Sequence, residues 1–433
     1  MTSLWCELAW LGGERAEVGV LIEIEGERIV SATPDSMLPR HVERLTGLTL
    51  PGLANAHSHA FQRALRGRTH THTGSFWTWR EQMYELAARL DPDSCFALSR
   101  AAFGEMALAG ITCVGEFHYL HHAPDGTPYD DPNAMGRAVL AAAQAAGLRI
   151  TLLDACYLHG GVKRFRDADA GAWAERVGAI AERPTARVGA AIHSVRAVDP
   201  ESARTVAQWA AERPLHAHVS EQPRENEECL AVHGRTPTAV LADAGALSER
   251  FTAVHATHLT DDDVARLGRA RVTACLCPTT ERDLADGIGP ARRLADAGAS
   301  LAVGSDSQAV VDLFEEARAI ELDERLATGV RGVHRADALL RAASAGGYAA
   351  LGWPEGGRLE AGALADLTTI SLDSIRLAGT PHAYAPASAV FAATAADVRH
   401  VMVGGHWIVR DGEHLALDVA AELRATLNPQ PGV

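Results

Sequence analysis

Two histidines separated by a single residue, His57 and His59, are the first residues in the chain whose types and spacing suggest chemistry. They end an apolar segment, and alternate residues of a strand point to the same side, so both imidazoles can aim at one point. A metal ion is the usual reason for such an arrangement. Because the chain contains 20 histidines, the pair alone fits a packing role equally well, and other ligands are needed to decide.

Further ligand-type side chains follow three later apolar segments, namely His218, His255 and Asp306. Imidazoles with one carboxylate match the ligands that zinc or another divalent ion accepts, with a position left for water. A single histidine such as His216, His233 or His258 is better explained as a packing or surface residue, and Asp306 alone could cap a helix. The whole constellation is far harder to explain by chance than any one member.

The apolar segments form a regular series that predicts the fold. Eight short runs are expected as strands: 48–53, 111–117, 149–156, 188–192, 215–219, 251–254, 272–276 and 300–304. Amphipathic helical patterns separate most of them, for example 93–109, 133–146, 200–213 and 261–267. Alternation of this kind predicts a parallel sheet, and eight repeats predict a closed (β/α)₈ barrel. The candidate ligands then lie at the carboxyl ends of the strands, where such barrels place their active sites.

The two ends of the chain have a different pattern. Residues 17–33 suggest a hairpin, and short strand patterns recur at 367–370, 398–403 and 407–409. We expect the terminal segments 1–50 and 356–433 to pair into one small β domain, with the barrel at 51–355.

Composition narrows the class of partner. A formal net charge of −15 argues against nucleic acid or an anionic membrane as partner, although a local arginine pocket could still bind an anion. The seven cysteines are scattered without metal-ligand spacing, and no apolar run reaches 18 residues. We expect a cytoplasmic protein with reduced thiols.

Together these features resemble the amidohydrolase superfamily. The resemblance implies an α/β fold, a distorted (β/α)₈ TIM-like barrel with a small β-sandwich domain formed by the N- and C-terminal segments. It also implies a metal held by four residues, His57, His59, His218 and Asp306, and catalysis by Glu221, His255 and Asp306. Many members bridge two metals with a carboxylated lysine after strand four. Here the sole lysine, Lys163, follows strand three, so we expect one divalent ion, Zn²⁺ first, with Fe²⁺ also possible.

The loops after the strands suggest the substrate. They offer five polar residues that could bind it: Gln62, Arg80, Tyr119, His193 and Arg196. Arginine binds a carboxylate through two parallel hydrogen bonds, so two arginines predict a small substrate with two carboxylates. For either arginine, a solvated surface charge is an equally good explanation.

Five segments, 57–64, 75–80, 116–122, 193–198 and 218–223, resemble the formimidoylglutamate deiminases of histidine degradation. The resemblance implies hydrolysis of N-formimidoyl-L-glutamate, a dianionic amidine, to N-formyl-L-glutamate and ammonia, with the five polar residues around the glutamate part, and a homodimer. The alternatives are a related deaminase acting on a heterocycle such as guanine or cytosine, and a hydrolase of another guanidino or formimidoyl acid. A non-catalytic barrel is disfavoured because the ligand set is complete.

Overall fold

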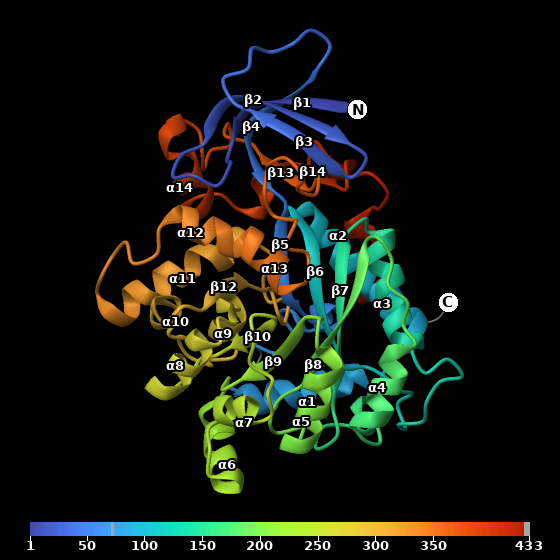
Figure 1. Ribbon diagram of the computed structural model, residues 1–433. Helices are drawn as coiled ribbons and strands as arrows, with labels where there is room; N and C mark the ends of the chain where they lie inside the picture. Colours follow the sequence, from blue (N-terminus) through green and yellow to red (C-terminus); the bar gives the residue numbers. More distant parts are fainter. Residues whose placement is uncertain (71–72, 428–433) are drawn as a thin grey trace.

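The computed structural model describes residues 1–70 and 73–427, which form a parallel barrel with a second, mixed sheet at one end (Figure 1). The barrel strands, in spatial as well as chain order, are β5 (Leu53–Ser58), β6 (Ile111–His118), β7 (Arg149–Cys156), β8 (Ala186–Ile192), β9 (Leu215–Val219), β10 (Phe251–His255), β11 (Thr273–Leu276) and β12 (Ser300–Val303). All neighbouring pairs are parallel, which confirms the predicted α/β barrel.

Helices cover the outer face of the barrel and its carboxyl end (Figure 1). They are α1 (Phe76–Ala87), α2 (Pro92–Leu108), α3 (Ala134–Ala145), α4 (Ala170–Gly178), α5 (Pro200–Ala210), α6 (Pro223–His233), α7 (Pro237–Asp243), α8 (Asp261–Arg269), α9 (Pro278–Asp283), α10 (Ala291–Ala297), α11 (Leu313–Thr328), α12 (Ala336–Arg341), α13 (Gly347–Ala350), α14 (Ala385–Phe391) and α15 (Val419–Leu427). Shorter helical segments are η1 (Ala60–Leu65), η2 (Lys163–Phe165), η3 (Ala342–Gly346), η4 (His382–Tyr384) and η5 (Ala395–Asp397). Strands that are covered on both faces have nearly continuous apolar sequences, so the apolar runs of the chain predicted the barrel strands. Among the described residues, no helix combines the length and apolar character needed to cross a membrane.

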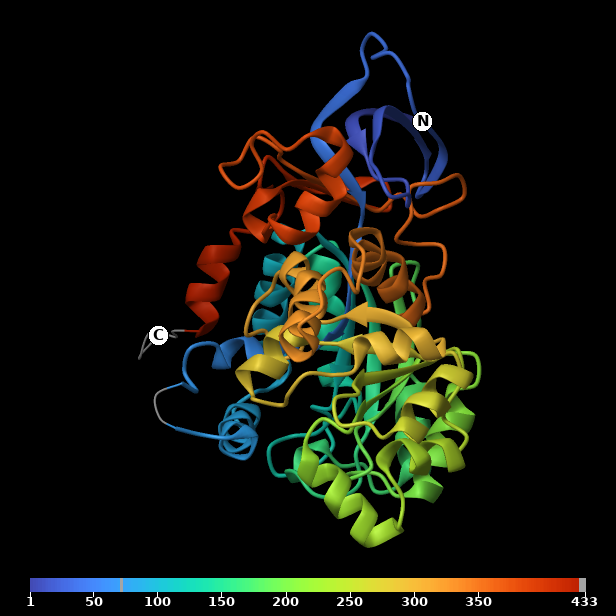
Figure 2. The same ribbon diagram turned by 90° about the vertical axis from the view of Figure 1, so that its left-hand side faces the viewer.

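The two terminal segments share the mixed sheet, as predicted. Its strand order is β16 (Glu413–His414), β15 (His406–Arg410), β14 (Val398–Val403), β13 (Leu367–Ile370), β4 (Glu43–Pro51), β1 (Thr2–Ala9), β2 (Glu17–Glu25) and β3 (Arg28–Thr33). Only the β1–β4 pair is parallel. Figure 2 shows α15 running down the side of the barrel, where Glu422 pairs with Arg100 of α2 at 2.7 Å.

The first predicted strand, 48–53, is wrong in its boundaries. Residues up to Pro51 belong to β4 and pair with β13 in the terminal sheet, whereas the barrel strand β5 begins at Leu53. The apolar run is continuous, but the chain passes from one sheet to the other at Gly52. A Cβ at Gly52 would lie 2.2 Å from Oγ1 of Thr112, so this joint requires glycine.

The first and last barrel strands are joined by backbone hydrogen bonds beyond the end of β12. The Asp306 amide donates to the His57 carbonyl, and the His59 amide donates to the Asp306 carbonyl, each at 3.0 Å. The Asn55 amide group donates to Ser305 Oγ at 2.7 Å, and the Ser305 amide donates back to Asn55 Oδ1 at 2.9 Å. The closure of the barrel therefore places three candidate ligands side by side.

A buried ion pair joins the barrel to the terminal sheet at the end away from these ligands. Arg149, at the start of β7, donates to Asp366 at 2.7 Å, and both side chains are almost completely buried. Asp366 also accepts hydrogen bonds from the Tyr348 hydroxyl and the Gly404 amide, each at 2.6 Å. The carboxylate thus satisfies donors from three separate segments.

Replacing Asp366 by Ala should lower the free energy of unfolding by about 3–5 kcal/mol, because Arg149 would stay buried with only its 3.4 Å contact to Glu27. Urea denaturation followed by circular dichroism measures this change. Glu249→Ala, which removes the exposed partner of Arg271, is the matched control and should cost no more than about 0.5 kcal/mol. Equal effects of the two variants would contradict a bridging role for Asp366.

Candidate metal and active site

The four predicted metal ligands converge at the carboxyl end of the barrel. Asp306 Oδ1 lies 3.3 Å from His57 Nε2 and 3.4 Å from His59 Nε2. His218 Nε2 lies 3.2 Å from His57 Nε2. Three imidazole nitrogens and one carboxylate oxygen therefore point at a common centre, with β5, β9 and the segment after β12 supplying them.

In two of the rings, a hydrogen bond made by Nδ1 determines that Nε2 faces the common centre. His59 Nδ1 donates to the Phe117 carbonyl at 2.8 Å, and His218 Nδ1 donates to the His193 carbonyl at 2.9 Å. The Nε2 lone pairs of both rings are thereby left free and directed inward. Metal-binding histidines use this same outer hydrogen bond to fix the tautomer and the orientation of the ring.

Electrostatics favour the protonation states that ligation requires. Burial lowers the pKa of His57 to about 3, and it also lowers the pKa of His59 and of His218. Burial alone would raise the pKa of Asp306, but its hydrogen bond and charge interactions with His57 hold it well below the usual range. Neutral imidazoles and an ionised carboxylate are the forms that bind a divalent cation, so the donor set fits a zinc-type ion.

Backbone strain is concentrated at this site. Asp306 has φ +42° and His255 has φ +65°, the left-handed region that costs a residue with a side chain about 1–3 kcal/mol. Such conformations persist only where the surroundings enforce them. Here the enforcing contacts include the hydrogen bonds that close the barrel.

A buried carboxyl group supports the turn between His57 and His59. Glu116 on β6 accepts a hydrogen bond from the Ser58 hydroxyl at 2.6 Å and another from the Ala60 amide at 2.7 Å. Burial raises the pKa of Glu116 to about 8, against the effect of those two donors. Segment 116–122 was recognised only as a matching segment, and no local pattern predicts this role for Glu116, because its contacts cross between strands.

His255 lies between the two other candidate catalytic groups. Its Nε2 is 3.6 Å from Glu221 Oε1 and 3.7 Å from Asp306 Oδ2. Its Nδ1 is 3.4 Å from Glu281 Oε1 on α9, a partner that the sequence analysis missed. Burial would lower the pKa of His255, but Glu221, Glu281 and Asp306 raise it well above its usual value. The imidazole is thus held where a proton can move between base and acid.

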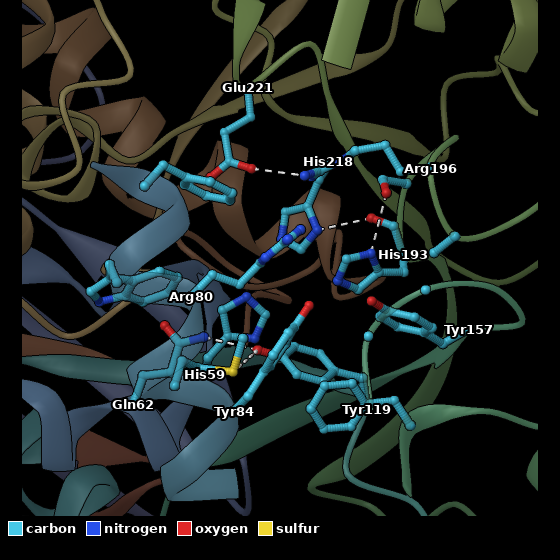
Figure 3. Close-up of a pocket in the computed structure, with 18 of the residues that line it drawn as sticks. His59, Gln62, Arg80, Tyr84, Tyr119, Tyr157, His193, Arg196, His218 and Glu221 are labelled. Atoms are coloured by element: carbon cyan, nitrogen blue, oxygen red, sulfur yellow. Dashed lines mark hydrogen bonds and ion pairs between the residues drawn. The ribbon is translucent and has the colours of Figure 1, made fainter. Parts of the chain in front are cut away.

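A pocket opens from this centre toward α1 (Figure 3). All five residues predicted to contact substrate line it: Gln62, Arg80, Tyr119, His193 and Arg196. Aromatic residues that the sequence analysis did not single out complete its walls, namely Phe76, Trp79, Tyr84, Tyr157 and Phe165. They come from α1, the segment after β7 and η2, and no local sequence pattern marks them as neighbours.

The two arginines of the pocket differ in their partners. The guanidinium carbon of Arg80 lies 4.5 Å from the centroid of the Trp77 ring. Within the described part of the chain, Arg80 has no carboxylate partner. Figure 3 shows its side chain reaching into the pocket. Arg196 Nη2 instead lies 3.5 Å from Glu221 Oε2 and 3.9 Å from Glu225 Oε2. Arg80 is therefore the available anion-binding group, whereas Arg196 already neutralises two acids.

The neutral polar residues are arranged around the same space. Gln62 Nε2 donates to the Tyr119 hydroxyl at 2.9 Å. The other side-chain atom, the buried Oε1 of Gln62, has no hydrogen-bond partner among the described residues. His193 packs on Tyr157 with ring centroids 4.3 Å apart. Burial lowers the pKa of His193 well below its usual value.

Lys163 is exposed in η2, outside the set of residues that line the pocket.

Known proteins match this fold over nearly its whole length. The model of the amidohydrolase family matches residues 48–408. The chain belongs to the amidohydrolase family. A formimidoylglutamate deiminase of Pseudomonas aeruginosa is 38% identical over 96% of this chain and 96% of its own. An 8-oxoguanine deaminase of the same species is 30% identical over 95% of this chain and 92% of its own. A crystal structure of an amidohydrolase from Brucella melitensis superposes with a TM-score of 0.90 at 33% identity, covering 99% of both chains.

Replacing His218 by Asn should lower affinity for a divalent ion at least ~10-fold, because one inward-facing nitrogen is lost. His216→Asn is the matched control on the same strand, since its Nε2 faces the Ala350 carbonyl at 3.0 Å. Elemental analysis of the purified proteins, with thermal unfolding in the presence and absence of a chelator, measures both. Metal binding should raise the unfolding temperature of the wild type and of His216→Asn. Unchanged metal content in His218→Asn would contradict the assignment.

Proposed function

We propose that this protein hydrolyses N-formimidoyl-L-glutamate to N-formyl-L-glutamate and ammonia, using one divalent ion. The observation that carries the proposal is the cation Arg80, free of a carboxylate partner among the described residues, in the pocket that also contains the metal-type cluster. The 38% identity to a formimidoylglutamate deiminase supports the same substrate.

Each end of such a substrate has a counterpart in the pocket. The glutamate carboxylates suit Arg80, with Gln62 and Tyr119 as neutral hydrogen-bonding groups beside it. The formimidoyl carbon would then face the cluster formed by His57, His59, His218 and Asp306. Arg196 would join the carboxylate site only by giving up part of its interaction with Glu221 and Glu225.

The chemistry follows from the positions of the acids and bases. A divalent ion held by the four ligands would lower the pKa of a water molecule and so supply the nucleophile. Asp306 lies where it can take the proton that this water loses, and His255, whose raised pKa favours the imidazolium, lies 3.7 Å from that carboxylate. Burial raises the pKa of Glu221, so the carboxyl group can retain a proton for the departing nitrogen. Loss of ammonia from the tetrahedral adduct completes the deimination.

Zinc is the ion we propose, because three imidazoles and a carboxylate with an open position are typical of catalytic zinc sites. The same ligands also accept iron(II). Binding competition between the two ions on metal-free protein would decide between them.

A heterocycle deaminase is the second candidate, favoured by the aromatic residues of the pocket and by the 30% identity to an 8-oxoguanine deaminase. A neutral ring would gain stacking on Tyr84, Tyr119 or Tyr157 but would leave the charge of Arg80 uncompensated. Ammonia release from N-formimidoyl-L-glutamate, N-formimidoyl-L-aspartate, guanine, 8-oxoguanine and cytosine separates the candidates. We expect rapid release from the glutamate derivative alone, and release only from a heterocycle would overturn the proposal.

Glu221→Gln should reduce kcat by about 10²–10⁴-fold, because the amide cannot deliver a proton to the leaving nitrogen. The metal content should stay at the wild-type level, since Glu221 lies outside the ligand set. Steady-state kinetics and elemental analysis on one preparation test both statements. A kcat within a few fold of wild type would remove Glu221 from the mechanism.

Arg80→Met should raise KM at least ~10-fold with a smaller change in kcat, because it removes a charge-assisted contact to a part of the substrate that does not react. Arg196→Met should lower kcat as well, since Arg196 also pairs with Glu221. Arg89→Met, at an exposed position just beyond α1, is the control and should leave both constants unchanged. An unaltered KM in Arg80→Met would contradict the anion site.

A further inference from the structure

An unusual number of acidic side chains surrounds His255. Glu281 Oε1, Glu221 Oε1 and Asp306 Oδ2 lie 3.4, 3.6 and 3.7 Å from its ring nitrogens. A fourth acid, Asp286, has a carboxyl oxygen within 4.8 Å of both a Glu221 oxygen and a His255 nitrogen. Acids this close do not all ionise together, so at least one of them holds a proton.

Asp286 differs from the other acids in its partners. Glu221 has Arg196 and His255, and Glu281 has the Cys277 amide and His255. Asp286 Oδ1 accepts a hydrogen bond from the neutral side-chain amide of Gln222. Its Oδ2 is buried and has no hydrogen-bond partner among the described residues.

The proton therefore belongs most naturally on Asp286. The residue is 2% exposed, and burial followed by the charge of Glu221 raises its pKa to about 9. A protonated oxygen also explains why no donor faces Oδ2, because that oxygen would itself carry the hydrogen. The titratable groups facing Asp286 are Glu221, His255 and Glu281; behind them lie Arg196, Glu225 and Asp306.

The backbone holds this carboxyl group in place. The Asp286 amide donates to the Glu281 carbonyl at 2.8 Å, and the Asp286 carbonyl accepts a hydrogen bond from His258 Nε2 at 2.7 Å. The flanking residues Ala285 and Gly287 have φ +58° and +116°, so Asp286 lies in a tight turn with its side chain buried. Asp286 does not line the pocket, so it reaches the substrate only through another residue.

We propose that Asp286 is a positioning and proton-supplying residue that acts through Glu221: the two carboxyl groups share one proton, which Asp286 holds until Glu221 passes it to the substrate. In this step the O–H bond of Asp286 breaks and an O–H bond forms on Glu221. Asp286, left as a carboxylate, regains a proton between turnovers, and the site releases the proton that the attacking water gave up, so the cycle consumes no net proton. The role rests on the proposed function only in requiring a leaving group that is protonated.

Asp286→Asn tests this because it keeps the shape and removes the exchangeable proton. We expect kcat to fall about 10-fold with KM unchanged. The alkaline limb of the kcat–pH profile should move to lower pH by about one unit, since Glu221 alone loses its proton more easily than the pair loses its last one. Asp286→Glu should restore the limb, and Asp283→Asn, at a partly buried residue of the same segment whose carboxylate pairs with His70, should behave as wild type.

Infrared spectroscopy of the free protein gives a reading that needs no substrate. At neutral pH the carboxylic-acid C=O absorption of the wild type and of Asp283→Asn should contain a component that Asp286→Asn lacks, beside the contribution expected from Glu116. An unchanged band, or an alkaline limb that stays in place while kcat falls, would overturn the proposal and leave Asp286 a structural residue. If N-formimidoyl-L-glutamate is not a substrate, the proposed function fails, whereas the infrared result still decides the state of Asp286.

Discussion

The hydrogen bonds that close the barrel between Asp306 and the segment 57–59 are the interaction on which the rest of this structure depends. They complete the fold and, in the same backbone contacts, bring a carboxylate against two imidazoles. Asp306 adopts a strained conformation to do so. Fold stability and the proposed metal site are therefore coupled at one place, with the Asn55–Ser305 pair and Glu116 as its supports.

The pocket is lined by both acidic and basic side chains. Acidic groups gather around His255, whereas Arg80 extends from α1 into the pocket (Figure 3). A substrate with anionic groups at one end and a nitrogen to be protonated at the other would match both. Arg196 stands between these regions, since it lines the pocket and also lies beside Glu221 and Glu225.

Much of the fold and of the candidate ligand set followed from local sequence features. The barrel strands are buried on both faces and so appear as apolar runs, and His57, His218 and Asp306 lie at or just past strand ends. The break at Gly52 was missed because the apolar run continues through it while the chain changes sheets. Roles for Glu281 and Asp286 were beyond local patterns, since each acts on His255 or Glu221 from a separate segment. The pairing of Arg196 with two acids could not be predicted either, because residue spacing in the sequence does not give the distances between side chains of separate segments.

The most direct test of the central claim is a crystal structure of the Glu221→Gln variant with N-formimidoyl-L-glutamate, recorded with anomalous scattering at a metal edge. We expect one ion about 2.0–2.2 Å from the inward nitrogens of His57, His59 and His218 and from Asp306. We also expect the formimidoyl carbon beside that ion and a substrate carboxylate on Arg80. An ion bound elsewhere, or a substrate with its carboxylates turned toward the histidines, would contradict this mechanism.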